Sequence, residues 1–190
     1  MIEIRGVSKS FGGIQAVSNC TLTLKDYAIT GLIGPNGSGK TTLFNLITGF
    51  IPPDRGEIYF KGKRIDGLLP HEVAMGGMVR TFQMTRVLPR MTVMENMLIA
   101  PPRQSGEQFR SLWLKPKAIR REESQNRKKA IELIEWIGLS HLKDQFAQNL
   151  SYGQQKLLEL ARGLMANPTM ILLDEPTAGI NPIMIRTIME

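Results

Sequence analysis

Along the first third of the chain, short runs of alternating apolar and polar residues are separated by turns. Residues 2–7 and 21–24 alternate with a period of two, which is typical of half-buried strands. Residues 29–33 form a more continuous apolar run that leads into a glycine, and this pattern predicts a buried central strand. Residues 41–48 have the apolar spacing of a helix, and residues 57–60 return to a strand pattern. The order of these elements predicts an α/β fold.

The middle of the chain has a helical pattern. Residues 91–100 predict a short helix with Thr92 as its N-cap, and residues 117–137 predict one long helix. The long helix has an apolar stripe at i+3 and i+4 spacing. This stripe consists of Ala130, Ile131, Ile134 and Ile137. We expect the block at about residues 92–149 to be a helical subdomain inserted into the α/β core.

The last part of the chain returns to the α/β pattern. A helix is predicted over residues 154–165, a strand over 170–173 and the start of another helix at Pro182. The 190 residues are 42% hydrophobic and 22% charged, which is the balance of a globular protein with a single domain. This composition excludes a disordered chain, and the single cysteine, Cys20, excludes an internal disulfide framework.

Charge and hydropathy exclude further classes of protein. The 24 Lys and Arg against 17 Asp and Glu give a formal net charge of +7, which fits nucleic acid, anionic lipid or phosphate ligands equally well. No apolar run approaches the ~20 residues that a membrane-spanning helix needs. The first residues also lack the apolar core of a signal peptide. If the protein works at a membrane, we expect it to act from the water side.

One stretch matches the phosphate-binding motif G-x-x-x-x-G-K-S/T in full, between a predicted strand and a predicted helix. Its glycines let backbone N–H groups turn toward phosphate oxygens at a helix start, although a glycine-rich turn with an incidental lysine is the simpler alternative. Lys40 would reach the β- and γ-phosphates, and the Thr41 hydroxyl would bind Mg²⁺. The motif consists of Gly34, Pro35, Asn36, Gly37, Ser38, Gly39, Lys40 and Thr41.

A second candidate element follows the apolar run at 170–173. Asp174 comes directly after this run, so we expect its carboxylate at the C-terminal end of a buried parallel strand, where it can share Mg²⁺ with Thr41. Glu175 lies one residue further and is a candidate general base for a water beside the γ-phosphate. A lone Asp-Glu pair is often only an exposed acidic turn. Together with the first motif, however, it predicts a P-loop NTPase.

A third element indicates which family of P-loop NTPases the sequence resembles. Residues 150–155 read Leu-Ser-Tyr-Gly-Gln-Gln and open a predicted helix. Ser151 there could be only an N-cap, but the run resembles the signature loop of ATP-binding cassette (ABC) proteins. Gln83 matches the Q-loop of that family, and Phe11 matches its adenine-stacking aromatic position. Residues 179–182 match the D-loop, with Asn181 where many members carry Asp.

The resemblance covers nearly the whole chain and is most specific for the ATPase subunits of branched-chain amino acid importers. It implies a P-loop NTPase core with an N-terminal antiparallel β region and the inserted helical subdomain. It also implies ATP and Mg²⁺ as cofactors, and hydrolysis of ATP coupled to transport. The residues expected to act in catalysis are Lys40, Gln83 and Glu175, and those expected to bind the metal are Thr41, Gln83 and Asp174. The nucleotide would be bound by Phe11, the motif residues 34–41, Thr42 and, from a second cassette, Ser151, Gly153 and Gln154.

The resemblance further implies protein partners. Two cassettes, identical or different, would pair head to tail and drive membrane permease subunits, with a solute-binding protein outside the membrane as an indirect partner and no nucleic acid. The chain would therefore lie peripherally on the cytoplasmic face of the cell membrane. The permease would dock near Gln83 and residues 84–100, where methionines offer an adaptable apolar groove. For most of these methionines, a place in the core is the simpler interpretation.

Two features depart from the family pattern. The switch histidine expected beyond the D-loop is missing, because His71 and His141 lie upstream in other contexts and are more simply surface residues. We therefore expect a chain truncated at its C-terminus. Without the histidine, we expect ATP binding to be retained and ATP hydrolysis to be impaired. Tyr27 stands where the family usually has a glycine, so the turn there needs a negative φ or carries local strain.

Two other functions stay open from the sequence. The first is a soluble cassette protein that acts on nucleic acid or ribosomes. Such proteins commonly carry two cassettes in tandem, and the sequence has one phosphate loop and no aromatic and basic platform for stacking bases. The second is a fragment that binds nucleotide without turnover.

Overall fold

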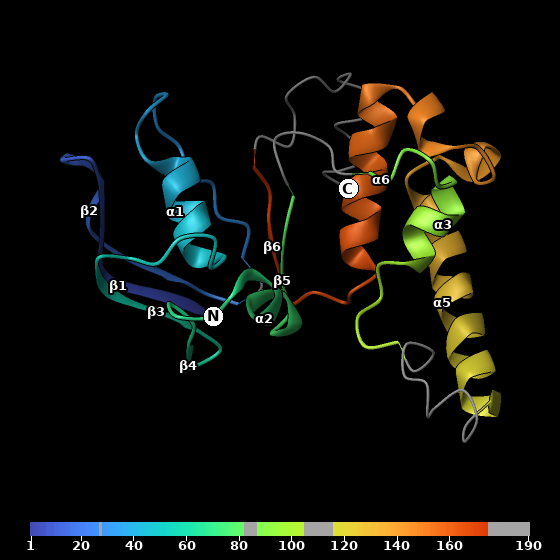
Figure 1. Cartoon of the computed structure of the whole chain (residues 1–190), viewed down its shortest axis with the longest axis horizontal. Helices are drawn as coiled ribbons and strands as arrows, with labels where there is room; N and C mark the ends of the chain where they lie inside the picture. Colours follow the sequence, from blue (N-terminus) through green and yellow to red (C-terminus); the bar gives the residue numbers. More distant parts are fainter. Residues whose placement is uncertain (27, 82–86, 105–115, 175–190) are drawn as a thin grey trace. The chain divides into compact units, whose positions relative to one another are not determined.

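The computed structural model describes residues 1–26, 28–81, 87–104 and 116–174. The chain divides into two compact units, Met1–Met78 and Val79–Glu190, which are described in turn (Figure 1). Within the described ranges, no helix is both long enough and apolar enough to cross a membrane.

An antiparallel sheet with strand order β2-β1-β3-β4 forms much of the first unit (Figure 1). Ile2 and Ile4 of β1 are buried opposite Phe60 and Ile58 of β3, so the period of two makes one face of the sheet apolar. The predicted N-terminal antiparallel region and the strand predicted at 57–60 are both present. The strands are β1 (Ile2–Phe11), β2 (Ile14–Leu24), β3 (Arg55–Phe60) and β4 (Lys63–Arg64).

β1 and β2 form one long hairpin that turns at Gly12 and Gly13. Both glycines have positive φ, 50° and 87°, as a two-residue type I′ turn requires. The turn pairs Phe11 with Ile14 and leaves Phe11 at the end of its strand. The strands are longer than the alternating runs at 2–7 and 21–24 indicated, because the tight turn lets the pairing continue to the tip.

The strand predicted at residues 29–33 is wrong. This segment has no strand geometry, and Ile29 and Ile33 are almost fully exposed. A strand forms only where a neighbour satisfies its backbone N–H and C=O groups, and no described strand pairs with this segment. An apolar run therefore becomes a buried strand only where another strand pairs with it.

Helix α1 (Lys40–Ile47) agrees with the helix predicted at 41–48 and buries Leu43, Leu46 and Ile47. The chain leaves it through Gly49, whose φ is 73°. A Cβ on Gly49 would lie 2.5 Å from the carbonyl oxygen of Leu68, so a residue without a side chain is needed there. A short helix, α2 (Pro70–Met75), follows in the same unit.

In the described part of the second unit, helices α3, α5 and α6 contribute to a shared apolar cluster, and β5 hydrogen-bonds to β6 (Figure 1). The helices predicted at 91–100, 117–137 and 154–165 and the strand predicted at 170–173 are confirmed, each shifted by one or two residues at an end. The helix predicted from Pro182 lies outside the described residues. The elements are β5 (Met78–Arg80), α3 (Val93–Leu98), α5 (Pro116–Trp136), η2 (Ser140–Leu142), η3 (Ala147–Asn149), α6 (Tyr152–Leu164) and β6 (Met170–Leu172).

The apolar stripe predicted for the long helix is confirmed except at one position. Ala130, Ile134 and Ile137 are buried in the cluster, but Ile131 is 47% exposed. Successive residues of a helix are rotated by about 100°, so a residue next to Ala130 leaves the buried face. The methionines of α3 are buried as well, which confirms their interpretation as core. The cluster also includes α6, so the subdomain boundary at 92–149 stays a prediction.

Asn96 is a fully buried polar residue within this apolar cluster. Its Oδ1 accepts a hydrogen bond from the Leu88 N–H at 2.8 Å. Its Nδ2 donates to the carbonyl oxygens of Leu88, Met91 and Thr92 at 3.0, 3.2 and 2.9 Å. Asn96 therefore satisfies backbone groups of the segment before α3 that have no regular secondary structure.

We expect Asn96→Ala to lower the free energy of unfolding by about 2 kcal/mol, because it removes the acceptor of the Leu88 N–H and leaves a cavity in the cluster, while the three carbonyls keep their backbone donors. Urea denaturation followed by circular dichroism measures this change. Gln125→Ala, at an exposed position of α5, is the control and should stay within about 0.5 kcal/mol of the parent chain. Equal midpoints for the two variants would show that Asn96 does not hold this segment.

Candidate functional site

Lys40 is the first residue of α1, and its side chain folds back over the loop that precedes the helix. Nζ donates to the carbonyl oxygens of Gly34 at 2.7 Å and Pro35 at 2.8 Å. The ammonium charge is thereby held over the loop instead of extending into solvent. The motif predicted from the sequence is thus a folded loop with a fixed cation.

Two glycines give the loop its shape. Gly37 and Gly39 have φ of 81° and 86°, in the left-handed region that other residues rarely adopt. Gly39 also lies against β2, where a Cβ would come within 2.3 Å of the carbonyl oxygen of Ala16. A side chain at position 39 would therefore push the loop away from the strand and move the start of α1.

The start of α1 differs from the starts of α3 and α6. No side chain caps α1, and its first turn contains no acidic residue. Thr92 and Ser151, in contrast, begin α3 and α6 with complete capping boxes. The first N–H groups of a helix have no partner within the helix and lie at the positive end of its dipole. With Lys40 at the same place, this end of α1 is suited to a phosphate group.

Phe11 lies at the tip of the β1–β2 hairpin and is 48% exposed. Lys9 Nζ lies 5.7 Å from the ring centroid and donates to Asp54 at 2.7 Å. The same carboxylate accepts a hydrogen bond from the Ser10 N–H at 2.7 Å. The hydrogen bonds from Lys9 and Ser10 lower the pKa of Asp54, so the carboxylate stays charged and holds the strand end. Phe11 is thus fixed in backbone position while its ring stays accessible for stacking.

Asp174 follows β6 closely, as the sequence predicts, and forms an ion pair with Arg80, the last residue of β5. Nη2 of Arg80 donates to Oδ2 of Asp174 at 2.9 Å, and the two side chains are 6% and 13% exposed. The Thr81 N–H donates to the Leu172 carbonyl at 3.0 Å, so backbone pairing continues up to the ion pair. Arg80 was not predicted as a site residue, since a single arginine at the end of a strand carries no signal of its partner.

Helix α6 is held at both ends by side-chain hydrogen bonds. At its start, Ser151 Oγ accepts from the Gln154 N–H at 3.3 Å, and Gln154 Oε1 accepts from the Ser151 N–H at 2.9 Å. At its other end, Lys129 Nζ donates to the carbonyls of Leu164 and Met165 at 2.7 and 3.0 Å. Burial lowers the pKa of the Lys129 ammonium. The predicted signature residues therefore lie at a helix start closed by a capping box. The role of Lys129 was missed because its partners, which include Oδ1 of Asn167 at 2.6 Å, lie 35 or more residues further along the chain.

Several predicted residues are not brought together by the described structure. Gln83, Glu175 and the D-loop with Asn181 lie outside the described residues, as does Tyr27 with its expected turn. Thr41 is exposed in the first unit and Asp174 lies in the second, so their convergence on one metal ion stays a prediction. His71 and His141 are exposed, which confirms them as surface residues.

The chemistry of the predicted metal ligands fits Mg²⁺. A hydroxyl, an amide and a carboxylate supply oxygen atoms, which this hard cation prefers. The described residues contain no cluster of three or more His, Cys, Asp or Glu side chains that could hold a metal by themselves.

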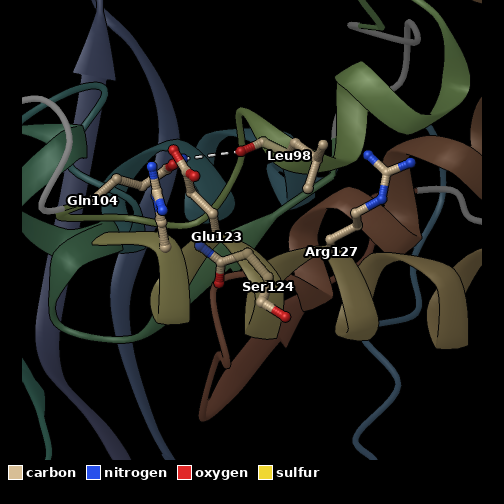
Figure 2. Close-up of a pocket in the computed structure, with 7 residues that line it drawn as sticks. Leu98, Gln104, Glu123, Ser124 and Arg127 are labelled. Atoms are coloured by element: carbon tan, nitrogen blue, oxygen red, sulfur yellow. Dashed lines mark hydrogen bonds between the residues drawn. The ribbon is translucent and has the colours of Figure 1, made fainter. Parts of the chain in front are cut away.

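A hollow of about 510 Å³ opens beside α5 (Figure 2). In Figure 2, Gln104 donates to the carbonyl of Leu98 at 2.9 Å along one side, and Arg127 lies at the other side. None of the lining residues is a predicted site residue. The lining consists of Leu98, Gln104, Arg120, Glu123, Ser124, Asn126 and Arg127.

Solved structures with the same fold include two cassettes. The chain superposes with a TM-score of 0.81 and 42% identity on MJ1267, an ATP-binding cassette of an ABC transporter, covering 99% of this chain and 74% of that chain. It superposes with a TM-score of 0.79 and 29% identity on MJ0796, a dimeric cassette bound to ADP and Pi, covering 100% and 80%. These neighbours confirm the predicted fold class.

Relatives with similar sequences belong to the same class of protein. The chain is 42% identical to the probable branched-chain amino acid transport ATP-binding protein LivG of Archaeoglobus fulgidus, over 100% of this chain and 73% of that protein. It is 41% identical to the high-affinity branched-chain amino acid transport ATP-binding protein BraF of Pseudomonas aeruginosa, over 96% and 71%. The ABC transporter family matches residues 17–178. The chain therefore belongs to the ABC transporter family and is one of its ATP-binding cassettes.

Proposed function

We propose that this chain is the ATP-hydrolysing subunit of an importer for branched-chain amino acids and works from the cytoplasmic face of the cell membrane. The observation that carries nucleotide binding is the Lys40 ammonium, held over the loop at the uncapped start of α1. The identity of 41–42% to branched-chain amino acid transport ATP-binding proteins supports the class of solute.

A phosphate group entering the loop would replace the partners of Lys40. Its Nζ now donates to two neutral carbonyl oxygens, and a phosphate anion is a stronger acceptor for an ammonium group. The N–H groups at the start of α1 would bind the remaining oxygens of the phosphate. The exposed ring of Phe11 would stack on the adenine, at the end of a strand that Asp54 holds in place.

Hydrolysis would require a bound Mg²⁺ ion and a base. Thr41, Gln83 and Asp174 would hold the ion, which neutralises the charge that develops on the phosphates. Glu175, directly after Asp174, would accept a proton from the attacking water. The roles of Gln83 and Glu175 rest on the sequence and on the family resemblance.

A second cassette would complete the site. Ser151, Gly153 and Gln154 of one chain would contact the γ-phosphate bound to the other chain, and the start of α6 would add a second favourable helix dipole. The dimeric cassette with ADP and Pi among the structural neighbours supports such pairing. The paired cassettes would dock permease subunits near Gln83 and the segment that follows it, with a solute-binding protein acting outside the membrane.

Reconstitution tests the proposed transport function. The chain, its permease subunits and a solute-binding protein are placed in vesicles, and uptake of labelled leucine is measured with and without ATP. ATP-dependent uptake is expected only when the chain is present. Uptake that does not need the chain, or hydrolysis stimulated by RNA instead of permease, would contradict the proposal.

We expect Lys40→Ala to weaken ATP binding about 100-fold, because about two charge-assisted hydrogen bonds to phosphate are lost. Isothermal titration calorimetry measures the affinity. Lys63→Ala, which removes an exposed charge from β4 of the same unit, is the control and should bind ATP like the parent chain. Unchanged affinity in Lys40→Ala would remove the loop from nucleotide binding.

Ser151→Ala separates capping from a role in catalysis. It should lower the free energy of unfolding by about 1 kcal/mol through loss of the cap and also reduce hydrolysis. Thr92→Ala is the matched control, since it removes an equivalent capping box from α3 at a position with no proposed contact to nucleotide. Thermal unfolding and turnover are measured for both variants. Equal turnover in the two would show that Ser151 is only a cap.

Glu175→Gln should retain ATP affinity and lose hydrolysis, because the amide cannot accept the proton of the attacking water. Calorimetry and phosphate release are compared at several protein concentrations, since the proposed pairing makes the rate per chain rise with concentration. Retained turnover would assign the base to another residue. No turnover in the parent chain at any concentration would favour nucleotide binding without hydrolysis.

A further inference from the structure

We propose that Arg80 is a positioning residue that acts as the resident counter-ion of Asp174, neutralising this carboxylate while no metal is bound and competing for it when a metal is bound. The inference rests on the proposed function, which places Asp174 among the metal ligands. It adds a residue that was not recognised from the sequence as part of the site.

The ion pair is held by the strands that carry it. The Thr81 N–H to Leu172 carbonyl bond, 3.0 Å long, continues the pairing of β5 with β6 up to the residues that follow them. Arg80 Nη2 lies 2.9 Å from Oδ2 of Asp174, and both side chains are largely buried. The guanidinium therefore stays beside the carboxylate because of the backbone pairing, and is not a mobile surface charge that meets it occasionally.

The charges explain why such a counter-ion matters. A largely buried carboxylate without a cation is costly, and it would also repel an anionic nucleotide that binds nearby. Arg80 supplies one positive charge, which lowers both costs before any metal is present. Because Arg80 already engages Oδ2, a metal ion that binds Asp174 has to share the charge of one carboxylate with the guanidinium. Two cations that share one anion weaken each other's binding reciprocally.

The inference predicts how metal and nucleotide binding are coupled. The measured quantity is the ratio of the ATP dissociation constant in EDTA to that in saturating Mg²⁺, obtained by calorimetry. Arg80→Met should raise this ratio about tenfold. Without Arg80, ATP binds less tightly in EDTA, and Mg²⁺ no longer competes with the guanidinium for Asp174, so MgATP binds more tightly. Arg80→Lys keeps the charge and should stay within about threefold of the parent ratio.

Three further variants make the result specific. Arg127→Met removes an arginine from the hollow beside α5 and should leave the ratio unchanged. Asp174→Asn should bring the ratio close to one, and adding Arg80→Met to it should then have no further effect, since the two residues act as one pair. This double variant also removes both charges at once, so it remains a test if Arg80→Met alone does not fold.

The outcomes separate this inference from the proposed function. An unchanged or lower ratio in Arg80→Met, with a reduced ratio in Asp174→Asn, would overturn the role of Arg80 alone. A parent-like ratio in Asp174→Asn would reject Asp174 as a metal ligand. If Arg80→Met does not fold, a further change in ratio on adding it to Asp174→Asn would overturn the inference, because Arg80 would then act without its partner.

Discussion

The close approach of Gly39 to the carbonyl oxygen of Ala16 is the constraint on which the candidate site depends. Only a residue without a side chain fits between β2 and the loop, and its positive φ turns the chain directly into α1. The position of Lys40, and with it the charge over the loop, follows from that turn. The sheet of the first unit is thus the support that places a cation and a helix dipole at one point.

In the second unit, polar side chains around a largely apolar cluster are held by hydrogen bonds and an ion pair. Asn96 satisfies the backbone before α3, and Lys129 satisfies the end of α6. Arg80 neutralises Asp174 beside the paired strands. Lys129 and Arg80 thereby fix α6 and the end of β6, next to the proposed functional residues, whereas Asn96 fixes only the segment before α3.

Prediction from the sequence succeeded where a local signal determines the outcome. The capping residues Thr92 and Ser151, the long amphipathic helix and the apolar run before Asp174 all have the structure that their patterns indicate. It failed where the outcome depends on a partner. Residues 29–33 look like a buried strand but have no described strand beside them, and Ile131 is apolar but lies off the buried face of α5.

The sequence by itself determined the family, the glycine-rich loop before α1 and the starts of the helices, because these depend on residues that are neighbours along the chain. Only the tertiary structure decided which side chains meet across long separations. The Lys129 contacts with the end of α6 and the pairing of Arg80 with Asp174 join residues far apart in sequence. No pattern along a chain records such contacts, since strand register and helix packing bring them about.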